Sequence, residues 1–256
     1  MEIVTYDLSK AFDKLRHDII LARLVECGFS STVISWFMSY FKDRPQLVKI
    51  GNETSSVLKV SSGVPQGSVI GPFMLSLVAG SFVPDLPNSI LVKYADNFTF
   101  CSRLLKSSNN GHLLSLHNAF VKWIESNELV INEKKCKALV VSFNNTCSAV
   151  NLPNVSLVQE LKILGVTFNC KLNWNVHTDL IVKRASQRLY VLRQLKGVVS
   201  RSKLLSVYNA FVRSVLEYAS PLFIGLSFTN AKKLDRIKRR FHRLTCGSEC
   251  HGDCMP

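Results

Sequence analysis

Two separated stretches place carboxylates where they could hold metal ions. Asp7 ends a short apolar run that predicts a buried strand, and Asp13 follows it on a predicted helix. Asp96 lies at the tip of a hairpin predicted over 91–100, with Asn97 beside it. A strand-end carboxylate that faces a hairpin-tip carboxylate can hold two divalent cations, which position the attacking and leaving oxygens of a phosphoryl transfer. In isolation each residue has a simpler interpretation, as a turn former or as a solvated helix charge.

A glycine-rich loop and a lysine pair add groups that suit phosphate chemistry. The loop is SSGVPQGSVIGP, residues 61–72, and its glycines allow a tight turn whose free N–H groups can approach a phosphate or a base. Gln66 in this loop can donate and accept hydrogen bonds at once, as base-pair recognition requires. Lys134 and Lys135 precede a predicted strand, where a cation could reach a departing pyrophosphate. A helix-capping loop and ordinary surface lysines would explain the same residues without a function.

Hydrophobic periodicity predicts the elements that position these residues. Strands are expected over 2–7, 46–50, 57–60, 137–143 and 161–168, in addition to the hairpin. Helices are expected over 11–27, from Ser30 or Ser31 to a stop at Pro45, over 72–82 and over 112–127. From about Val176 only helices are expected, near 176–196, 201–217 and 229–246. We therefore predict an α+β domain over 1–172 and a basic helical domain over 173–256.

Composition narrows the class of protein. With 256 residues, 47% of them hydrophobic, the chain can form one large or two modest domains with real cores. The net charge of +14 favours a polyanionic partner, nucleic acid before a membrane surface. The apolar run 69–83 is interrupted by Gly and Pro and falls short of the about 20 residues of a bilayer span, so no membrane partner is predicted. Scattered cysteines and the lack of a signal peptide predict a reduced, intracellular protein.

Taken in order, these stretches resemble the reverse transcriptase of non-LTR (LINE-type) retrotransposons. The segment YDLSKAFDKLRHD resembles polymerase motif A, GVPQGSVIGP resembles motif B, KYADN resembles motif C with the family form YADD altered, and NEKKC resembles motif D. LKILGVTF with LNW, then LEYASPLF and LDRIKRRFHRL, extend the resemblance over nearly the whole chain. It implies a right-hand polymerase palm, an antiparallel sheet with packed helices, followed by an all-helical thumb and C-terminal region.

The resemblance implies roles for the acidic and basic residues of the centre. Asp7 and Asp96 would be the principal metal-binding carboxylates, with Asn97 in the third ligand position, and the metal would be Mg²⁺ or alternatively Mn²⁺. The backbone around Leu8 would lie near the incoming triphosphate. Lys135, rather than its neighbour, matches the motif D lysine, which acts as general acid or charge stabiliser for the leaving pyrophosphate. The implied reaction extends a DNA primer on an RNA template with deoxynucleoside triphosphates.

Further roles concern recognition of the substrates. Phe12 falls where this family keeps an aromatic gate that excludes a ribose 2′-OH, although a core aromatic would look the same. Gln66 and Gly67 would line the nascent base pair and the template, and Arg44 would contact the template. The basic residues of the helix near 176–196 would bind a primer–template backbone without sequence preference, unless they form an ordinary solvated face. They are Lys183, Arg184, Arg188 and Arg193.

Two departures from the family pattern lead us to expect an impaired polymerase. Nothing precedes the motif A stretch, so most of the fingers and an upstream endonuclease would have to come from a longer protein. Asn97 supplies an oxygen but no charge, which should weaken metal binding. The alternatives are a catalytically dead or domesticated nucleic-acid-binding remnant, and an RNA-templated RNA polymerase, which Phe12 opposes. A working copy would act in the nucleus.

The C-terminal Cys246, Cys250, His251 and Cys254 suit either a zinc knuckle or a reduced loop.

Overall fold

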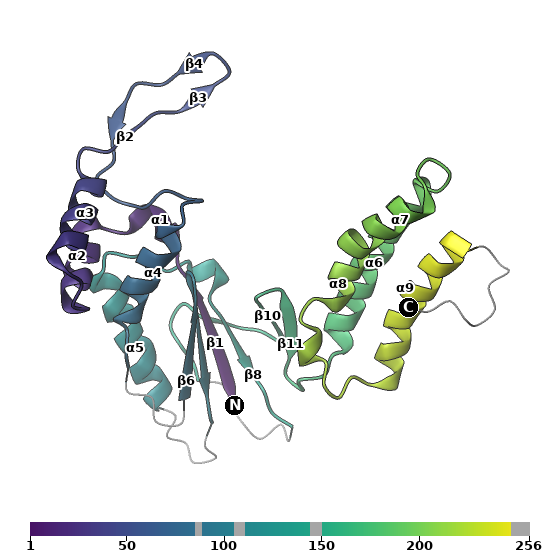
Figure 1. The fold of residues 1–256 in the computed structure, drawn as a ribbon. Helices are drawn as coiled ribbons and strands as arrows, with labels where there is room; N and C mark the ends of the chain where they lie inside the picture. The colour runs from purple at the N-terminus through teal and green to yellow at the C-terminus, as the bar shows by residue number, and fades with distance from the viewer. Residues whose placement is uncertain (85–88, 105–110, 144–149, 247–256) are drawn as a thin grey trace. The chain divides into compact units, whose positions relative to one another are not determined.

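The computed structural model describes residues 1–84, 89–104, 111–143 and 150–246, and the chain divides into two compact units (Figure 1). The first unit is residues 1–159 and the second is residues 160–256. This division lies before the boundary predicted at 172, so a short hairpin that the sequence assigned to the first domain belongs to the second unit. No helix in the described ranges is both long and apolar enough to span a membrane. Cys27, Cys101, Cys136 and Cys170 are free thiols.

A five-stranded sheet forms the centre of the first unit, with the strand order β6-β7-β1-β8-β9. The strands are β1 (Glu2–Asp7), β6 (Ser89–Tyr94), β7 (Asn97–Ser102), β8 (Lys137–Val140) and β9 (Ser156–Leu157). Neighbouring strands are antiparallel except β8 and β9, which are parallel. The predicted antiparallel sheet with packed helices is thus confirmed, with one short parallel pair at its edge.

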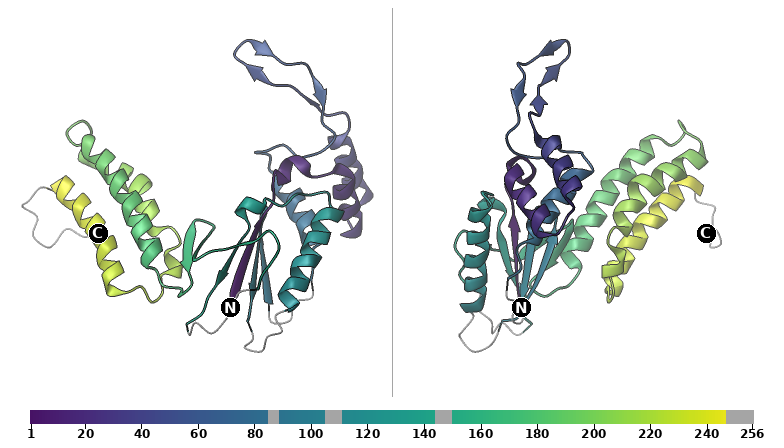
Figure 2. Two further views of the ribbon diagram at one scale, coloured as in Figure 1. Left: turned by 180° about the vertical axis from the view of Figure 1, so that it is seen from behind. Right: turned by 60° about the vertical axis from the view of Figure 1, so that its left-hand side comes forward.

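One face of this sheet carries the main hydrophobic core. Val4 and Tyr6 of β1 and Phe98 and Phe100 of β7 point to that face, because alternate residues of a strand point the same way. They pack against α4 (Ile70–Gly80) and α5 (Gly111–Ser126), whose Phe120 is fully buried. Figure 2 shows α5 running along the sheet. Each such buried aromatic contributes about 1.5–3 kcal/mol by leaving water, which fixes the sheet on its helices.

The single helix predicted for 11–27 is wrong, because the structure has two helices there. They are α1 (Ala11–Lys14) and α2 (His17–Glu26). The Phe12 carbonyl accepts a hydrogen bond from Val64 N at 2.8 Å, and the Leu15 carbonyl accepts one from Gly63 N at 2.6 Å. These bonds tie the connection between the helices to the glycine-rich loop. The following helix, α3 (Ser31–Phe41), is capped by the Ser30 hydroxyl as predicted.

A long hairpin leads from α3 to the glycine-rich loop and projects from the rest of the first unit (Figure 1). Its paired segments are β2 (Pro45–Gln46) with β5 (Leu58–Lys59), and β3 (Lys49–Ile50) with β4 (Glu53–Thr54). The strands predicted over 46–50 and 57–60 correspond to its two arms. All of its paired residues are exposed, so the hairpin has no core of its own.

The second unit begins with a hairpin and continues as helices. The hairpin joins β10 (Glu160–Ile163) to β11 (Val166–Asn169), so the single strand predicted for 161–168 is wrong. Leu164 and Gly165 turn the chain with φ of 45° and 85°. The helices are α6 (Asn175–Gln194), α7 (Arg201–Tyr208), which runs through a π-helical turn (Asn209–Arg213) into α8 (Ser214–Glu217), and α9 (Phe228–Cys246). Their apolar stripes form a second hydrophobic core.

Candidate active site

Asp7 and the tip of the β6–β7 hairpin meet at one edge of the sheet. Asp7 is the last residue of β1 and lies opposite Asn97, the first residue of β7. The next residue of β1's chain, Leu8, donates its backbone N–H to the Asp96 carbonyl at 3.2 Å. Ala95 completes the two-residue turn with φ of 51°, a conformation that only a tight turn imposes on alanine. The backbones of the two predicted metal-binding residues, Asp7 and Asp96, therefore lie side by side at this edge of the sheet.

Asn97 interacts with the carboxylate next to it. Its Nδ2 donates a hydrogen bond to Asp96 Oδ1 at 3.0 Å. The carboxamide thus satisfies one oxygen of Asp96 and leaves its own carbonyl oxygen as a neutral ligand. A second aspartate here would instead repel Asp96 and double the negative charge of the hairpin tip.

Lys135 contributes the cation of this cluster. It ends a short 3₁₀-helix, η1 (Glu133–Lys135), that the Asp7 carbonyl holds in place by accepting a hydrogen bond from Asn132 N at 2.8 Å. The Lys135 ammonium lies 3.1 Å from Asp7 Oδ1 and 3.3 Å from Asp7 Oδ2. The Lys135 side chain is 62% exposed and the Asp7 side chain only 16%, so the lysine can swing away while the carboxylate stays fixed.

The donor set at this edge fits a Mg²⁺ ion that keeps water and phosphate ligands. Asp7 Oδ1 is buried and accepts no hydrogen bond, because Lys135 directs its hydrogen bond to the other oxygen. The Lys135 ammonium, 3.1 Å from this oxygen, balances its charge, and a bound cation would take the place of the ammonium. Within the described residues no three His, Cys, Asp or Glu side chains gather into a closed metal cage. Mg²⁺ is usually bound by one or two carboxylates plus substrate phosphates, so Asp7 and Asp96 suffice.

The glycine-rich loop lies beside α1 and is shaped by Gly63. This glycine has φ of 86°, and a Cβ there would lie 2.7 Å from the Asp13 carbonyl oxygen. The Gly63 carbonyl also accepts a hydrogen bond from His17 Nε2 at 2.8 Å. Gln66 is exposed and donates to the Asp13 carboxylate at 3.0 Å, and Gly67 is exposed with φ of 81°. Asp13 is exposed, as its alternative interpretation as a solvated helix charge implies, and its carboxylate also accepts the hydrogen bond that orients Gln66.

A cavity of about 680 Å³ opens between this loop and the base of the long hairpin. Asp13, Gln66 and Arg44 line it together with Gln46 and Ser62. The Arg44 guanidinium lies over the Tyr40 ring, 4.6 Å from its centroid, which holds the cation at the cavity wall. Donors and acceptors thus line a space large enough for a nucleotide-sized ligand.

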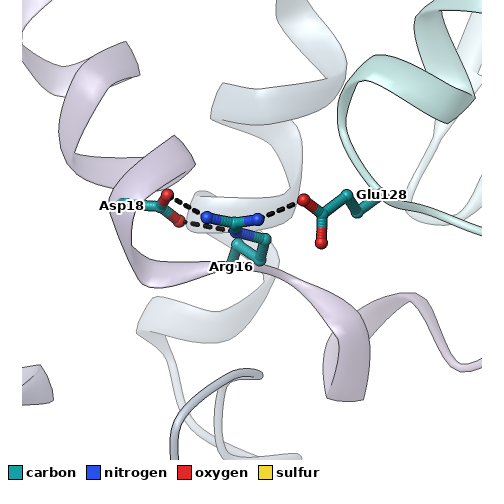
Figure 3. A network of polar contacts seen from close by, with 3 residues as sticks. All are labelled: Arg16, Asp18 and Glu128. Carbon is teal, nitrogen blue, oxygen red and sulfur yellow. Dashed lines mark hydrogen bonds and ion pairs between the residues drawn. The ribbon is translucent and has the colours of Figure 1, made fainter.

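Phe12 is half-buried and packs against the main core, so the structure gives it the contacts of a core aromatic and leaves part of its ring accessible. Leu8 is buried, and its backbone rather than its side chain meets the hairpin. Arg16 braces the region from the other side, where it contacts Asp18 at the start of α2 and Glu128 after α5 (Figure 3). Its hydrogen bonds lower the pKa of the Asp18 carboxyl.

Lys93, which sequence analysis did not single out, links two parts of the site. It precedes Tyr94 in β6 and donates its ammonium hydrogens to the carbonyls of Ala79, at 2.9 Å, and Phe82. These carbonyls lie at the C-terminal end of α4, where a cation is favourable. Burial lowers the pKa of the Lys93 ammonium. The helix that follows the glycine-rich loop is thereby attached to the strand that enters the hairpin tip.

The predicted nucleic-acid-binding residues of α6 differ in their surroundings. Lys183, Arg184 and Arg193 are exposed. Arg188 instead donates to the Phe211 carbonyl at 2.7 Å and lies over the Phe211 ring, 4.7 Å from its centroid. The first three form no ion pair with any described residue, whereas Arg188 has a structural contact within the second unit. The side chains of the C-terminal Cys/His cluster lie outside the described residues.

Comparison with known proteins identifies what this arrangement resembles. Residues 2–168 match the family described as reverse transcriptase (RNA-dependent DNA polymerase). Two proteins of Drosophila melanogaster are 28% identical to the chain: a "Probable RNA-directed DNA polymerase from transposon BS", over 269 residues, and the RNA-directed DNA polymerase from mobile element jockey, over 261 residues. Each match covers 94% of this chain but only 28% of the relative, so the chain spans little more than a quarter of their length.

Solved structures support the fold. The apo telomerase of Candida tropicalis, truncated from its C-terminal domain, matches with a TM-score of 0.52 at 15% identity. The match covers 67% of this chain and 34% of the telomerase chain. At this identity the likeness concerns the path of the backbone alone.

Proposed function

The chain belongs to the reverse transcriptase (RNA-dependent DNA polymerase) family, and on that premise we propose that it carries the nucleotidyl-transfer centre of a non-LTR retrotransposon polymerase. The proposed reaction extends a DNA primer on an RNA template, and the protein acts in the nucleus at the target DNA. The observation that carries the proposal is the meeting of Asp7, Asp96 and Lys135 at one sheet edge.

We propose that Asp7 and Asp96 hold the divalent metal ions that this family uses. When bound, the ions supply positive charge to the attacking and leaving oxygens. Asp7 is suited to this role because its Oδ1 is buried without a hydrogen bond. Lys135 then moves from Asp7 to the leaving pyrophosphate, which its exposed side chain permits. The backbone at Leu8 would border the triphosphate.

The substrate roles rest on the elements around the glycine-rich loop. We propose that Gln66 and Gly67 border the nascent base pair and that Arg44 meets the template strand in the cavity beside them. Phe12 would exclude a ribose 2′-OH and favour deoxynucleotides. Lys183, Arg184 and Arg193 of α6 would bind phosphates of the primer–template, whereas the contact of Arg188 with Phe211 suits an anchoring role.

We further propose that this copy is impaired. Asn97 adds no negative charge, and its amide hydrogen bond to Asp96 competes with a metal for one carboxylate oxygen.

Primer extension on an RNA template with Mg²⁺ and deoxynucleotides tests the proposal. We expect slow incorporation that is lost in Asp7→Asn and Asp96→Asn and raised at least tenfold in Asn97→Asp. Terbium luminescence, measured without substrate, should show tighter ion binding in Asn97→Asp and weaker binding in Asp96→Asn. Ribonucleotides offered in place of deoxynucleotides should be used only after Phe12→Ala.

The second candidate function, a non-catalytic nucleic-acid-binding remnant, is favoured by the amide at residue 97 and by the high net charge. It predicts RNA binding without incorporation in the native chain, in Asn97→Asp, and after addition of a fingers segment. Such a result, with ion binding unchanged by Asp96→Asn, would contradict the polymerase proposal.

A further inference from the structure

Helix α9 carries a row of cations on the side that faces away from its hydrophobic contacts. Its buried side chains include Asn230, Ile237 and Phe241, and Leu234 and Leu244 pack against the second core. At 100° per residue these positions fall on one side of the helix. The opposite side carries basic residues spaced four, three and four apart. They are Lys232, Arg236, Arg239 and Arg243, and we call them the α9 stripe.

The stripe is free to meet a ligand. All four side chains are exposed. Within the described ranges none of them takes part in an ion pair, whereas the neighbouring Lys233 pairs with Asp179 at 2.5 Å. Asp235 is the only acidic residue of α9, and it lies at the margin of the stripe. Lys232 lies over the Phe228 ring at 4.2 Å, which holds the first cation of the row in position.

This surface differs from the one predicted on α6. Helix α9 packs against α6 and the second core through its apolar side, so the stripe on the far side points away from α6. A strand that contacts Lys183, Arg184 and Arg193 of α6 does not thereby contact the stripe. The two sets of cations can therefore be tested separately.

The dimensions of the stripe suit a phosphate backbone. A helix rises 1.5 Å per residue, so the eleven steps from Lys232 to Arg243 span about 16 Å. One nucleic acid strand carries a phosphate about every 3.4 Å along the helix axis, so the stripe faces about five phosphates. Four evenly spaced cations with a single carboxylate, Asp235, at their margin match such a repeating polyanion better than an acidic protein surface, whose charges are irregular.

We propose that the α9 stripe is a second nucleic-acid-binding surface, which holds the phosphate backbone of RNA or of an RNA–DNA duplex outside the reaction centre. The proposal rests on the proposed function for the identity of the polyanion. Binding there is independent of sequence and keeps the chain on its template between nucleotide additions.

Salt-dependent binding of the full chain tests this surface. The test variant replaces all four stripe residues by Gln, and fluorescence anisotropy measures Kd for a labelled single-stranded RNA and for an RNA–DNA duplex between 50 and 200 mM salt. We expect the slope of log K against log salt to become shallower by about 2.8 for the single strand or about 3.6 for the duplex, the four lost contacts at about 0.7 or 0.9 each. The ligand is the nucleic acid whose slope changes by the amount expected for its own form, because four lost contacts give different changes for a single strand and a duplex.

A matched control separates the stripe from net charge. Lys14, Lys122, Lys162 and Lys171 are exposed and scattered over different elements, and their replacement by Gln removes the same charge. This control should change the slope by less than about 1. The variant with Arg236, Arg239 and Arg243 all replaced by Lys should keep the slope, because it keeps the positive charges of the stripe.

Primer extension at low salt with saturating primer–template separates this proposal from the proposed function. The stripe variant should extend primers as the native chain does, whereas Asp96→Asn should lose extension and keep the binding slope. An unchanged slope in the stripe variant, or an equal change in the scattered control, would overturn the proposal. It would also be overturned if the stripe variant lost only its binding to anionic vesicles, because the stripe would then serve a membrane surface.

Discussion

At the scale of the residue, Asp7 has three neighbours of different chemistry. Its backbone pairs with Asn97 and accepts a hydrogen bond from Asn132, so the position of its carboxylate is set by two elements. Its side chain meets Lys135, which is mostly exposed. The backbone contacts with Asn97 and Asn132 hold the carboxylate in place. The exposed Lys135 side chain occupies the space where a cation would bind.

Lys135→Met should therefore tighten the binding of a divalent or lanthanide ion. The ammonium competes with the ion for Asp7, and an exposed ion pair is worth about 0.2–1 kcal/mol, so affinity should rise about 1.4- to 5-fold. Terbium luminescence titration measures this change. Lys134→Met is the matched control, because Lys134 is an exposed neighbour that forms no ion pair with Asp7 in the described part of the chain. Equal affinities in the native chain and Lys135→Met would refute the competition.

Glu2 should make stability depend on pH. It is fully buried, its Oε2 accepts a hydrogen bond from Val150 N at 3.1 Å, and its Oε1 accepts none. Burial raises the pKa of this carboxyl. The raised pKa means that Glu2 stabilises the folded chain in its protonated form. This stabilisation is fully present below the unfolded pKa of about 4.3, and it is lost as the pH rises through the higher folded pKa.

The substitution Glu2→Gln should remove this loss of stability at high pH, because the glutamine side chain does not ionise. We expect the free energy of unfolding of the variant at pH 8 to exceed that of the native chain by about 1 kcal/mol, which raises the melting temperature, and the difference to vanish near pH 4. Thermal denaturation followed by circular dichroism at several pH values measures it. Glu125→Gln, at an exposed position, should leave the pH profile unchanged. A variant that is destabilised equally at both pH values would contradict the prediction.

At the scale of the element, the loop that carries Gln66 depends on a single glycine. Gly63 has a positive φ, and its missing Cβ lets the loop approach the Asp13 carbonyl. The N–H groups of Gly63 and Val64 also bind the connection between α1 and α2. The loop and the two helices therefore form one local unit behind the candidate active site.

Gly63→Ala should destabilise the first unit by about 2–4 kcal/mol. A left-handed conformation costs a non-glycine residue about 1–2 kcal/mol, and the contact at 2.7 Å adds steric repulsion with backbone atoms that cannot rotate away. Urea denaturation measures the change. Gly51→Ala is the control, because Gly51 has φ of 61° with no atom within 4 Å of its virtual Cβ. Similar losses in both variants would show that the close approach carries no cost.

The elements also show what could be predicted from the sequence. Periodicity located β1, α4, α5 and the helices of the second unit, because each has an apolar stripe of regular spacing. It missed the break between α1 and α2, since hydrogen bonds from a loop distant in sequence cause it. The order of the motifs brought Asp7 and Asp96 together correctly. The contacts of Asp13, Lys93 and Arg188 with distant partners leave no local pattern and required the structure.

At the scale of the whole molecule, the chain has two separate hydrophobic cores. One surrounds Phe98 and Phe120 in the first unit, and the other surrounds Leu192 and Val212 in the second. No residue belongs to both clusters. Each unit therefore has its own source of stability.

Leu192→Ala should loosen the second unit alone. The side chain is fully buried, so its truncation should cost about 2–5 kcal/mol. Hydrogen exchange followed by mass spectrometry should show faster exchange in α6–α9 and unchanged exchange in β1, β7 and α5. Met74→Ala, in the other core, should give the reverse pattern. Equal acceleration of both units in either variant would mean that the chain unfolds as one cooperative body.

Lys93 has a second consequence, which concerns neighbouring molecules. Strand β6 is an outer strand of the five-stranded sheet, and its Ile90, Val92 and Tyr94 are exposed. Such a strand invites a second chain to add to the sheet. An inward-pointing charge opposes this, because a newcomer would cover an ammonium group whose hydrogen bonds already go to α4. We therefore expect the lysine that attaches the hairpin to the helix also to disfavour edge-to-edge association of concentrated protein.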